Sequence, residues 1–184
     1  MSRVLVALTG ASGHPVAVEF LRRCPAEETY LVASRWGRSV LTAETGLTLE
    51  ALAPRARKTF SDDDLFAPFA SGSTPLDAMV IVPCSASTLG KLAAGIADTL
   101  ITRAAQVVLK ERRRLVLGLR EAPLSSIMLE NCLKLSRDGA VLVPLSPPFY
   151  TNPKTLEDAV RDMTDKLLSA AGFPSGAPWR PEAL

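Results

Sequence analysis

Residues 3–13 read Arg3-Val-Leu-Val-Ala-Leu-Thr-Gly-Ala-Ser-Gly13, the pattern of a buried strand followed by a tight turn. The unbroken apolar run from Val4 to Leu8 is typical of a parallel strand that is covered on both faces. A helix is expected over 15–23, because Pro15 suits the first turn of a helix, where its missing N–H group is no loss. A strand, a turn and a helix in this order predict an α/β fold with a parallel sheet.

The turn has the composition of a small anion site. Gly10 and Gly13 permit a tight backbone turn, and Ser12 supplies a hydroxyl group. The start of the next helix adds N–H groups and the positive end of the helix dipole, so one phosphate group would fit. The turn lacks the three-glycine dinucleotide fingerprint and the Gly-Lys-Ser/Thr of a P-loop, and a plain tight connection is the alternative explanation.

The chain has 184 residues, 47% of them hydrophobic and 22% charged, which favours one domain with a large core. No uncharged apolar run approaches the roughly 18 residues of a membrane span, so the surplus of apolar residues suggests contacts between subunits. The net charge of +2 is too small to favour nucleic-acid binding. The one dense basic run, Lys110–Arg114, lies where a helix is expected to end, and cations there complement the helix dipole.

The three cysteines, Cys24, Cys84 and Cys132, are odd in number and widely spaced, which argues against a disulfide framework or a zinc site. Reduced thiols are typical of the cytoplasm, and the N-terminus lacks the pattern of a signal peptide. The sequence therefore predicts a cytoplasmic protein without membrane association.

Strand and helix patterns alternate along the rest of the chain. Strands are expected over 29–34, 58–60, 76–83, 115–119 and 140–144. Helices are expected over 38–44, 48–53, 99–112, 127–137 and 155–170, with a further helix that ends at Ala94. The Pro-rich residues 173–184 are expected to form an extended arm, in which Trp179 either packs on a neighbour or is a lone surface aromatic residue.

The loop over 62–75 contains two aromatic residues, Phe66 and Phe69. Turn chemistry explains the Gly and Pro residues of this loop but not its Phe residues. We expect both Phe side chains to be exposed and to contact a neighbouring subunit or an apolar ligand.

Polar residues follow several strands, at the sheet edge where open α/β folds bind ligands. Ser85 and Thr88 follow the central strand, and Arg120 and Glu121 follow the next. The alternative for Ser85 is an ordinary helix cap, and for Arg120 and Glu121 it is a mutual ion pair. Otherwise Glu121 suits proton transfer and Arg120 suits holding an anion. Glu44 lies near the same edge, where a solvated helix acid is the simpler explanation.

Arg103 and Lys110 are seven residues apart, so the helix over 99–112 would project both from one face. The residues between them are apolar. Cations embedded among core-facing positions need a carboxylate or a bound phosphate as partner, unless they reach out to solvent.

Other classes of protein fit less well. An NAD-dependent oxidoreductase would need an acid after the second strand, where this chain has Arg35. Arg35 could bind the 2′-phosphate of NADP, so an NADP-dependent oxidoreductase is weakened by the single short glycine turn but not excluded. A non-catalytic flavin carrier would leave four polar residues without a role, namely Arg103, Lys110, Glu121 and Tyr150. A serine hydrolase would need a Gly-x-Ser-x-Gly elbow, which the chain lacks.

A series of motifs resembles the UbiX family of flavin prenyltransferases, in the order of that family and over residues 3 to 172. The motifs are Thr9-Gly-Ala-Ser-Gly13, Pro83-Cys-Ser85, Arg103-Ala-Ala105, Leu109-Lys-Glu-Arg-Arg113 leading into Leu115-Val-Leu117, Arg120-Glu-Ala-Pro123, Ser125-Ser126, Leu129-Glu-Asn131 and Pro148-Phe-Tyr150. Residues 1–172 are therefore expected to form an FMN-binding prenyltransferase domain, with 173–184 as its C-terminal arm.

The resemblance implies a single flavodoxin-like (Rossmann-type) doubly wound parallel sheet with helices on both faces, assembled into a homododecamer that binds FMN between subunits. It implies a metal-independent enzyme that joins the dimethylallyl group of dimethylallyl phosphate to N5 and C6 of reduced FMN. The product, prenylated FMN, would serve UbiD-type decarboxylases. Members of the family once carried the name of aromatic acid or 3-octaprenyl-4-hydroxybenzoate carboxy-lyases.

Position by position, the resemblance assigns a flavin set, a phosphate set and a catalytic set of residues. The flavin set is Gly10, Ala11, Ser12, Ser34, Ser85, Thr88 and Arg120. The set that handles the prenyl phosphate is Arg103, Lys110, Tyr150 and Lys166. The expected catalytic residues are Glu121, Glu44, Lys110 and Tyr150, and no metal ligand is expected.

Three positions depart from the family pattern. Lys166 replaces a common arginine with a single point charge, Leu65 replaces a tryptophan beside the prenyl group, and His14 replaces a small residue. Phe66 or Trp179 would have to compensate for the missing aromatic ring. A flavin-dependent cysteine decarboxylase on the same fold is the nearest alternative. It would need a catalytic histidine in the first helix and an Asn- and Met-rich substrate clamp. His14 is the only histidine of the chain, and no such clamp is visible.

Overall fold

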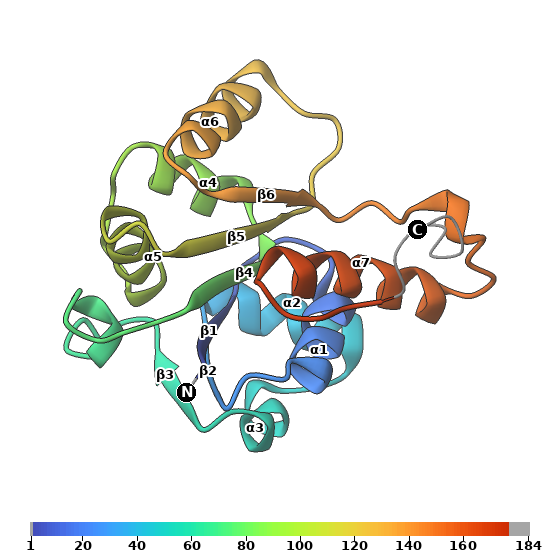
Figure 1. Ribbon diagram of the computed structural model, residues 1–184, viewed down its shortest axis with the longest axis horizontal. Helices are drawn as coiled ribbons and strands as arrows, with labels where there is room; N and C mark the ends of the chain where they lie inside the picture. Colours follow the sequence, from blue (N-terminus) through green and yellow to red (C-terminus); the bar gives the residue numbers. More distant parts are fainter. Residues whose placement is uncertain (1, 177–184) are drawn as a thin grey trace.

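The computed structural model describes residues 2–176, and its centre is one six-stranded parallel sheet (Figure 1). In spatial order the strands are β3 (Lys58–Ser61), β2 (Glu28–Ala33), β1 (Arg3–Leu8), β4 (Ala78–Cys84), β5 (Arg114–Leu119) and β6 (Val141–Pro144). The order 3-2-1-4-5-6 reverses direction between β1 and β4, the point at which doubly wound sheets bind ligands. The predicted flavodoxin-like, Rossmann-type fold is therefore confirmed.

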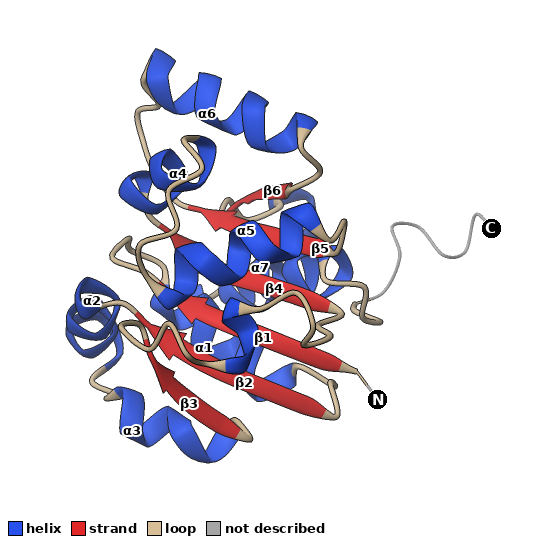
Figure 2. Cartoon of the chain, turned by 90° about the vertical axis from the view of Figure 1, so that its left-hand side faces the viewer, coloured by secondary structure: helices blue, strands red, loops and turns tan. Residues whose placement is uncertain are grey.

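Helices cover both faces of the sheet (Figure 2). One face packs against α1 (His14–Arg23), α2 (Arg35–Thr45), α3 (Leu49–Leu52) and α7 (Leu156–Ala170). The other face packs against α4 (Ala86–Ala93), α5 (Leu100–Lys110) and α6 (Ser126–Arg137). The short turns η1 (Ala53–Arg55), η2 (Pro68–Ala70) and η3 (Phe149–Thr151) complete the fold. Within residues 2–176, no helix is long and apolar enough to span a membrane.

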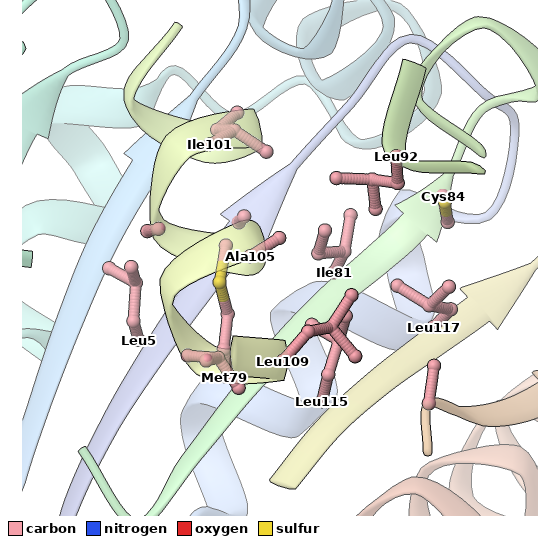
Figure 3. Packing of buried hydrophobic residues seen from close by; sticks show 14 of the residues in the cluster. Leu5, Met79, Ile81, Cys84, Leu92, Ile101, Ala105, Leu109, Leu115 and Leu117 are labelled. Atoms are coloured by element: carbon pink, nitrogen blue, oxygen red, sulfur yellow. The ribbon is translucent and has the colours of Figure 1, made fainter. Parts of the chain in front are cut away.

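The apolar runs of the strands divide between two cores. In β1, Leu5 faces the core under α5, whereas Val6 faces the core under α1, because successive side chains of a strand point to opposite faces. Figure 3 shows the first core, where Ala105 and Leu109 of α5 pack over Leu5 and the neighbouring strands. Both faces are buried, which explains why the strands have unbroken apolar sequences.

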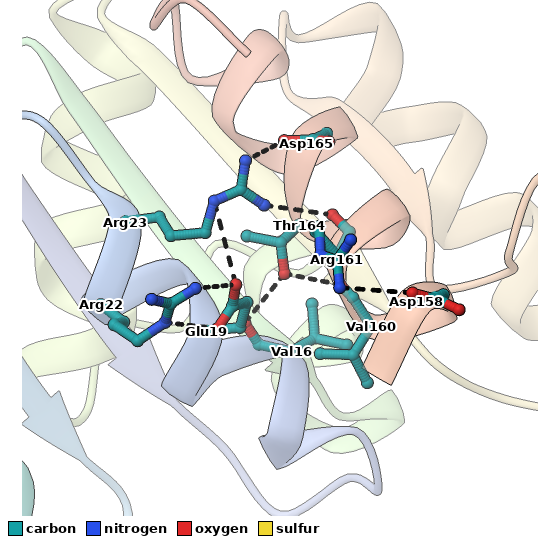
Figure 4. A network of polar contacts seen from close by, with 9 residues as sticks. All are labelled: Val16, Glu19, Arg22, Arg23, Asp158, Val160, Arg161, Thr164 and Asp165. Carbon is teal, nitrogen blue, oxygen red and sulfur yellow. Dashed lines mark hydrogen bonds and ion pairs between the residues drawn. The ribbon is translucent and has the colours of Figure 1, made fainter. Parts of the chain in front are cut away.

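A network of ion pairs and hydrogen bonds joins the last helix, α7, to the first helix, α1 (Figure 4). Arg23 of α1 forms ion pairs with Asp165 of α7 and with Glu19 of its own helix. The Thr164 hydroxyl donates to the Val160 carbonyl at 2.8 Å. Partly exposed ion pairs contribute at most about 1 kcal/mol each, so the buried apolar side chains of α7 stabilise this contact more strongly.

Three expectations differ from the structure or lie outside it. The helix expected over 38–44 begins at Arg35, because the Ser34 side chain accepts a hydrogen bond from Gly37 N and caps it. Phe66 is fully exposed, as predicted, but the prediction for Phe69 is wrong. Phe69 is buried in an aromatic cluster, its ring centroid 4.8 Å from that of Tyr30. Trp179 lies outside the described residues.

Candidate functional site

Three helices begin around one cavity of about 910 Å³ at the carboxyl edge of the sheet. Their N-caps, Ser34 of α2, Ser85 of α4 and Thr99 of α5, all line it. None of the three helices has an acidic residue in its first turn. Three positive dipole ends therefore converge on one cavity, which suits a polar or anionic ligand.

Asp62 is a partly buried acid in the wall of this cavity. Its carboxylate accepts a hydrogen bond from Ile101 N at 2.9 Å, at the start of α5. Burial raises the pKa of Asp62 above its ordinary value, because desolvation outweighs the hydrogen bonds from Ile101 N and from the Thr99 side chain.

A second pocket of about 330 Å³ shares Gly10, Ser85 and Ser87 with the first and therefore adjoins it. It is lined in addition by Arg120 and Glu121, which follow β5. The cavity and the pocket, together called the two hollows, are lined by the whole expected flavin set and by Glu121. All of these residues therefore lie at the carboxyl edge of the sheet. These residues are Gly10, Ala11, Ser12, Ser34, Ser85, Thr88, Arg120 and Glu121. Among the ion pairs of the described residues, none joins Arg120 to Glu121.

Position 10 requires glycine because the turn after β1 approaches α2 closely. A Cβ atom on Gly10 would meet Trp36 Cβ at 2.7 Å, too near for real atoms. The Trp36 side chain is 66% exposed at the cavity wall, and the Arg35 guanidinium lies 5.6 Å from its ring centroid. Gly13 has φ +119°, a left-handed conformation that favours glycine.

Thr9 joins the turn that follows β1 to the turn that follows β4, and the sequence analysis did not predict this role. Its buried hydroxyl donates to the Pro83 carbonyl at 2.7 Å and accepts from Ser85 N at 2.8 Å. The only available signal was a hydroxyl residue directly after a buried strand, which many turns share.

The Thr9→Val variant is expected to lose about 1–3 kcal/mol of unfolding free energy, because it leaves Ser85 N without its partner and removes the shorter of the two hydrogen bonds to the buried Pro83 carbonyl, so that only the bond from Thr9 N at 3.3 Å remains. Urea denaturation measures this loss. Thr9→Ser keeps the hydroxyl and is the control. Equal urea midpoints for the Val and Ser variants would contradict the role of the hydroxyl.

Glu44 binds the N–H groups at the start of α1 that were predicted to bind a phosphate. Its Oε2 accepts from Gly13 N and His14 N, both at 2.9 Å, at the start of α1. Glu44 is thus a bound helix cap rather than the solvated acid of the simpler explanation. Burial opposes its ionisation, but hydrogen bonds from the Ser12 hydroxyl and the two amides outweigh burial and lower the pKa of Glu44.

The expected phosphate set lies outside both hollows of the subunit. Arg103 and Lys110 are exposed rather than embedded among core residues, because the apolar residues of α5 turn inward without them. Lys110 is paired with Glu111. Tyr150, on η3, is 67% exposed, and Lys166 is exposed on α7.

Lys110 lies at the opposite edge of the sheet from the two hollows. The first turn of α5 is at the carboxyl edge, where Leu100 N donates to the Asp62 carbonyl at 2.7 Å. The last turn ends beside Gly72, whose carbonyl accepts from the Arg113 side chain, just before β5 begins. A six-residue strand separates the edges by about 20 Å, so Lys110 cannot reach the cavity of its own subunit.

Comparison with known proteins places the chain in a family. The family model described as Flavoprotein matches residues 1–167. The flavin prenyltransferase UbiX of Thermoplasma acidophilum is 48% identical over 170 residues, which cover 92% of this chain and 94% of the relative. The chain belongs to the UbiX family of flavin prenyltransferases. A probable UbiX-like flavin prenyltransferase of Streptomyces sp. is 47% identical over 178 residues, which cover 95% of this chain and 89% of the relative.

A solved UbiX structure has the same fold. It is AnUbiX (PadA1) in complex with FMN and dimethylallyl pyrophosphate, with a TM-score of 0.91 and 38% identity, and the match covers 97% of this chain and 99% of that one. Two of the residues that depart from the UbiX pattern have distinct surroundings here. Leu65 is 41% exposed next to the fully exposed Phe66, and His14 is fully buried against Glu44.

Proposed function

We propose that this chain transfers the dimethylallyl group of dimethylallyl phosphate to N5 and C6 of reduced FMN. Membership of the UbiX family sets the reaction class, and one observation in the structure supports it. A cavity surrounded by helix N-termini adjoins a pocket with an arginine and a glutamate at the switch point of the sheet. The product, prenylated FMN, would be used by a decarboxylase of the UbiD type.

The residues at the carboxyl edge fit an FMN molecule. The cavity of about 910 Å³ has the size of a cofactor site, and the hydroxyl groups of Ser34 and Ser85 with the N-termini of α2 and α4 suit a phosphate and a polar ring edge. The cation of Arg120 adds a further anion contact. When bound, reduced FMN supplies the electron-rich nitrogen and carbon that accept the prenyl group.

The phosphate set is proposed to act across subunit boundaries. Lys110 cannot reach the cavity of its own chain, so it would serve the site of a neighbour. The FMN-dependent UbiX-like decarboxylase of Escherichia coli O157:H7 is dodecameric, and it is 41% identical with a TM-score of 0.92 over 97% of this chain and 98% of its own. We propose the same assembly here. Exposed apolar side chains on and before α6 support it, namely Leu124, Ile127, Leu129 and Leu133, which are 43% to 71% exposed.

In the assembled site, each proposed residue has one task. Arg103, Lys110 and Lys166 would stabilise the negative charge of the departing phosphate as the allylic C–O bond breaks, and Tyr150 would donate a hydrogen bond to it. A monophosphate needs fewer countercharges than a diphosphate, so fixed cations can replace a metal ion. Glu121 would accept the proton that leaves as the new ring closes. Lys166 gives one point charge where an arginine would give a bidentate contact.

The experiment is an anaerobic incubation of the protein with reduced FMN and dimethylallyl phosphate, followed by mass spectrometry of the extracted flavin. A parallel sample contains dimethylallyl diphosphate. The expected result is a flavin heavier by one five-carbon unit with the monophosphate. An unchanged flavin in both samples, or carbon dioxide released from a peptide with a C-terminal cysteine, would contradict the proposal and favour a decarboxylase.

The location of the protein is also a proposal. The three cysteines are free thiols, and Cys84 is buried. Free thiols are typical of a reducing compartment, which supports the cytoplasm.

A further inference from the structure

His14 is buried without a hydrogen-bond partner. It is the only histidine of the chain and the first residue of α1, and its side chain has no exposed surface. Within the described residues, neither Nδ1 nor Nε2 makes a hydrogen bond. The acceptors that act on the ring are the Glu44 carboxylate and the Gly37 backbone carbonyl, but neither makes a hydrogen bond of normal geometry with it. A buried polar ring without such a bond destabilises a folded chain, so its presence calls for a role.

Glu44 lies beside this ring. The distance from Nδ1 of His14 to Oε2 of Glu44 is 3.6 Å, slightly too long for a hydrogen bond. The same Oε2 accepts from the backbone N–H of His14 and of Gly13. A small rotation of the ring or the carboxylate would add a third donor to this oxygen.

The charges at this contact are defined by their surroundings. Burial lowers the pKa of His14, and the carboxylate of Glu44 and the carbonyl of Gly37 only partly oppose this effect. Glu44 is the only ionisable group of the described residues whose charge acts on His14. At neutral pH the pair is therefore a neutral imidazole facing a carboxylate. A lone pair on Nδ1 would repel that carboxylate, whereas an Nδ1–H group would bind it.

We propose that His14 is a positioning residue whose Nδ1–H group hydrogen-bonds the Glu44 carboxylate and holds it next to Ser12 at the reaction site. The inference rests on the proposed function, in which Glu44 is one of the catalytic residues. Glu44 is then fixed from two sides, by the amides of α1 and by the imidazole. Loss of the imidazole donor would leave the carboxylate in place but less stabilised, and its pKa would rise.

Nuclear magnetic resonance of the untagged protein tests the bond without any turnover. Because the chain has one histidine, ¹⁵N-labelled histidine gives a single imidazole signal set. We expect the neutral Nδ1–H tautomer at neutral pH and above, and a change of the Nδ1 shift in Glu44→Gln. A pure Nε2–H tautomer, or shifts that ignore Glu44→Gln, would overturn the proposal. This readout remains valid even if the protein transfers no prenyl group.

Kinetics of three variants then separate positioning from mere packing. His14→Asn places an N–H donor near the site of Nδ1, His14→Gln places one near the site of Nε2, and His14→Leu has no donor. The acid limb of the kcat profile is expected to move up by about one pH unit in His14→Leu and His14→Gln, with KM for the prenyl donor within about two-fold, and to return in His14→Asn. An unchanged acid limb in His14→Leu, or no rescue by Asn, would contradict the role.

Discussion

Glu121→Gln is expected to lower the rate of prenylated flavin formation by about 10²- to 10⁴-fold, because an amide cannot accept the proton that leaves as the ring closes. Glu121 lines the smaller pocket together with Ser12 and Arg120. In the part of the chain that the structure describes, its carboxylate accepts one hydrogen bond, a local one from Ala122 N at 3.2 Å. The carboxylate therefore contributes little to the stability of the fold, and the substitution should leave the fold intact.

The measurement is single-turnover formation of the product under anaerobic conditions, with FMN affinity determined in parallel. The affinity should stay within about two-fold, since Gln has the size of Glu and no positive charge is lost. Glu157→Gln, an exposed acid at the start of α7, is the matched control and should react like the unmodified protein. Full turnover in Glu121→Gln with normal FMN binding would exclude the proton-accepting role.

The sequence predicted the frame of the site because its signals are local. The apolar run of β1 and the Gly-Ser turn after it identify a covered strand and its connection. Ser85, Arg120 and Glu121 each follow a predicted strand, and the carboxyl ends of parallel strands must share one edge. A rule of topology therefore brought residues together that are far apart along the chain.

Contacts set by tertiary packing were not predictable. Glu44 accepts hydrogen bonds from backbone amides at the start of α1 that are about 30 residues away in the sequence. No local sequence pattern predicts this contact between α2 and α1. Phe69 enters an aromatic cluster with Tyr30 and Phe60 although its loop is rich in turn residues. In both cases the partner comes from a different element, and burial overrides the local composition.

The position of Lys110 relative to the cavity of its own subunit could have been predicted from the direction of α5. The sequence analysis placed Arg103 and Lys110 on one face of this helix, and both are exposed, but it did not consider the direction of the helix. A helix that connects parallel strands runs back from the carboxyl edge to the amino edge, so the end that carries Lys110 had to be distant from the site. A role for Lys110 in the reaction therefore requires that it serve the site of a neighbouring subunit.

Lys110→Ala is expected to slow the reaction by about 10²- to 10³-fold, the usual effect of removing one fixed group that stabilises transition-state charge. If Lys110 serves the site of a neighbouring subunit, two inactive variants should restore each other. In mixed oligomers of Lys110→Ala and Glu121→Gln, half of the subunits carry an intact Glu121 in their own site. In half of these sites, the neighbouring subunit contributes an intact Lys110. About a quarter of the full rate should return at equal mixing.

The mixed oligomers are obtained by co-expression of differently tagged chains and tandem affinity purification, and their rates are compared with those of each parent. Glu44→Gln mixed with Glu121→Gln is the matched control. Both residues lie at the same edge of one subunit, so every site keeps one lesion and no rate should return. Mixed Lys110→Ala and Glu121→Gln oligomers that remain as slow as the parents would place both residues in one subunit's site. That result is incompatible with a lysine about 20 Å away across the sheet, so it would require α5 to be rearranged in the assembly.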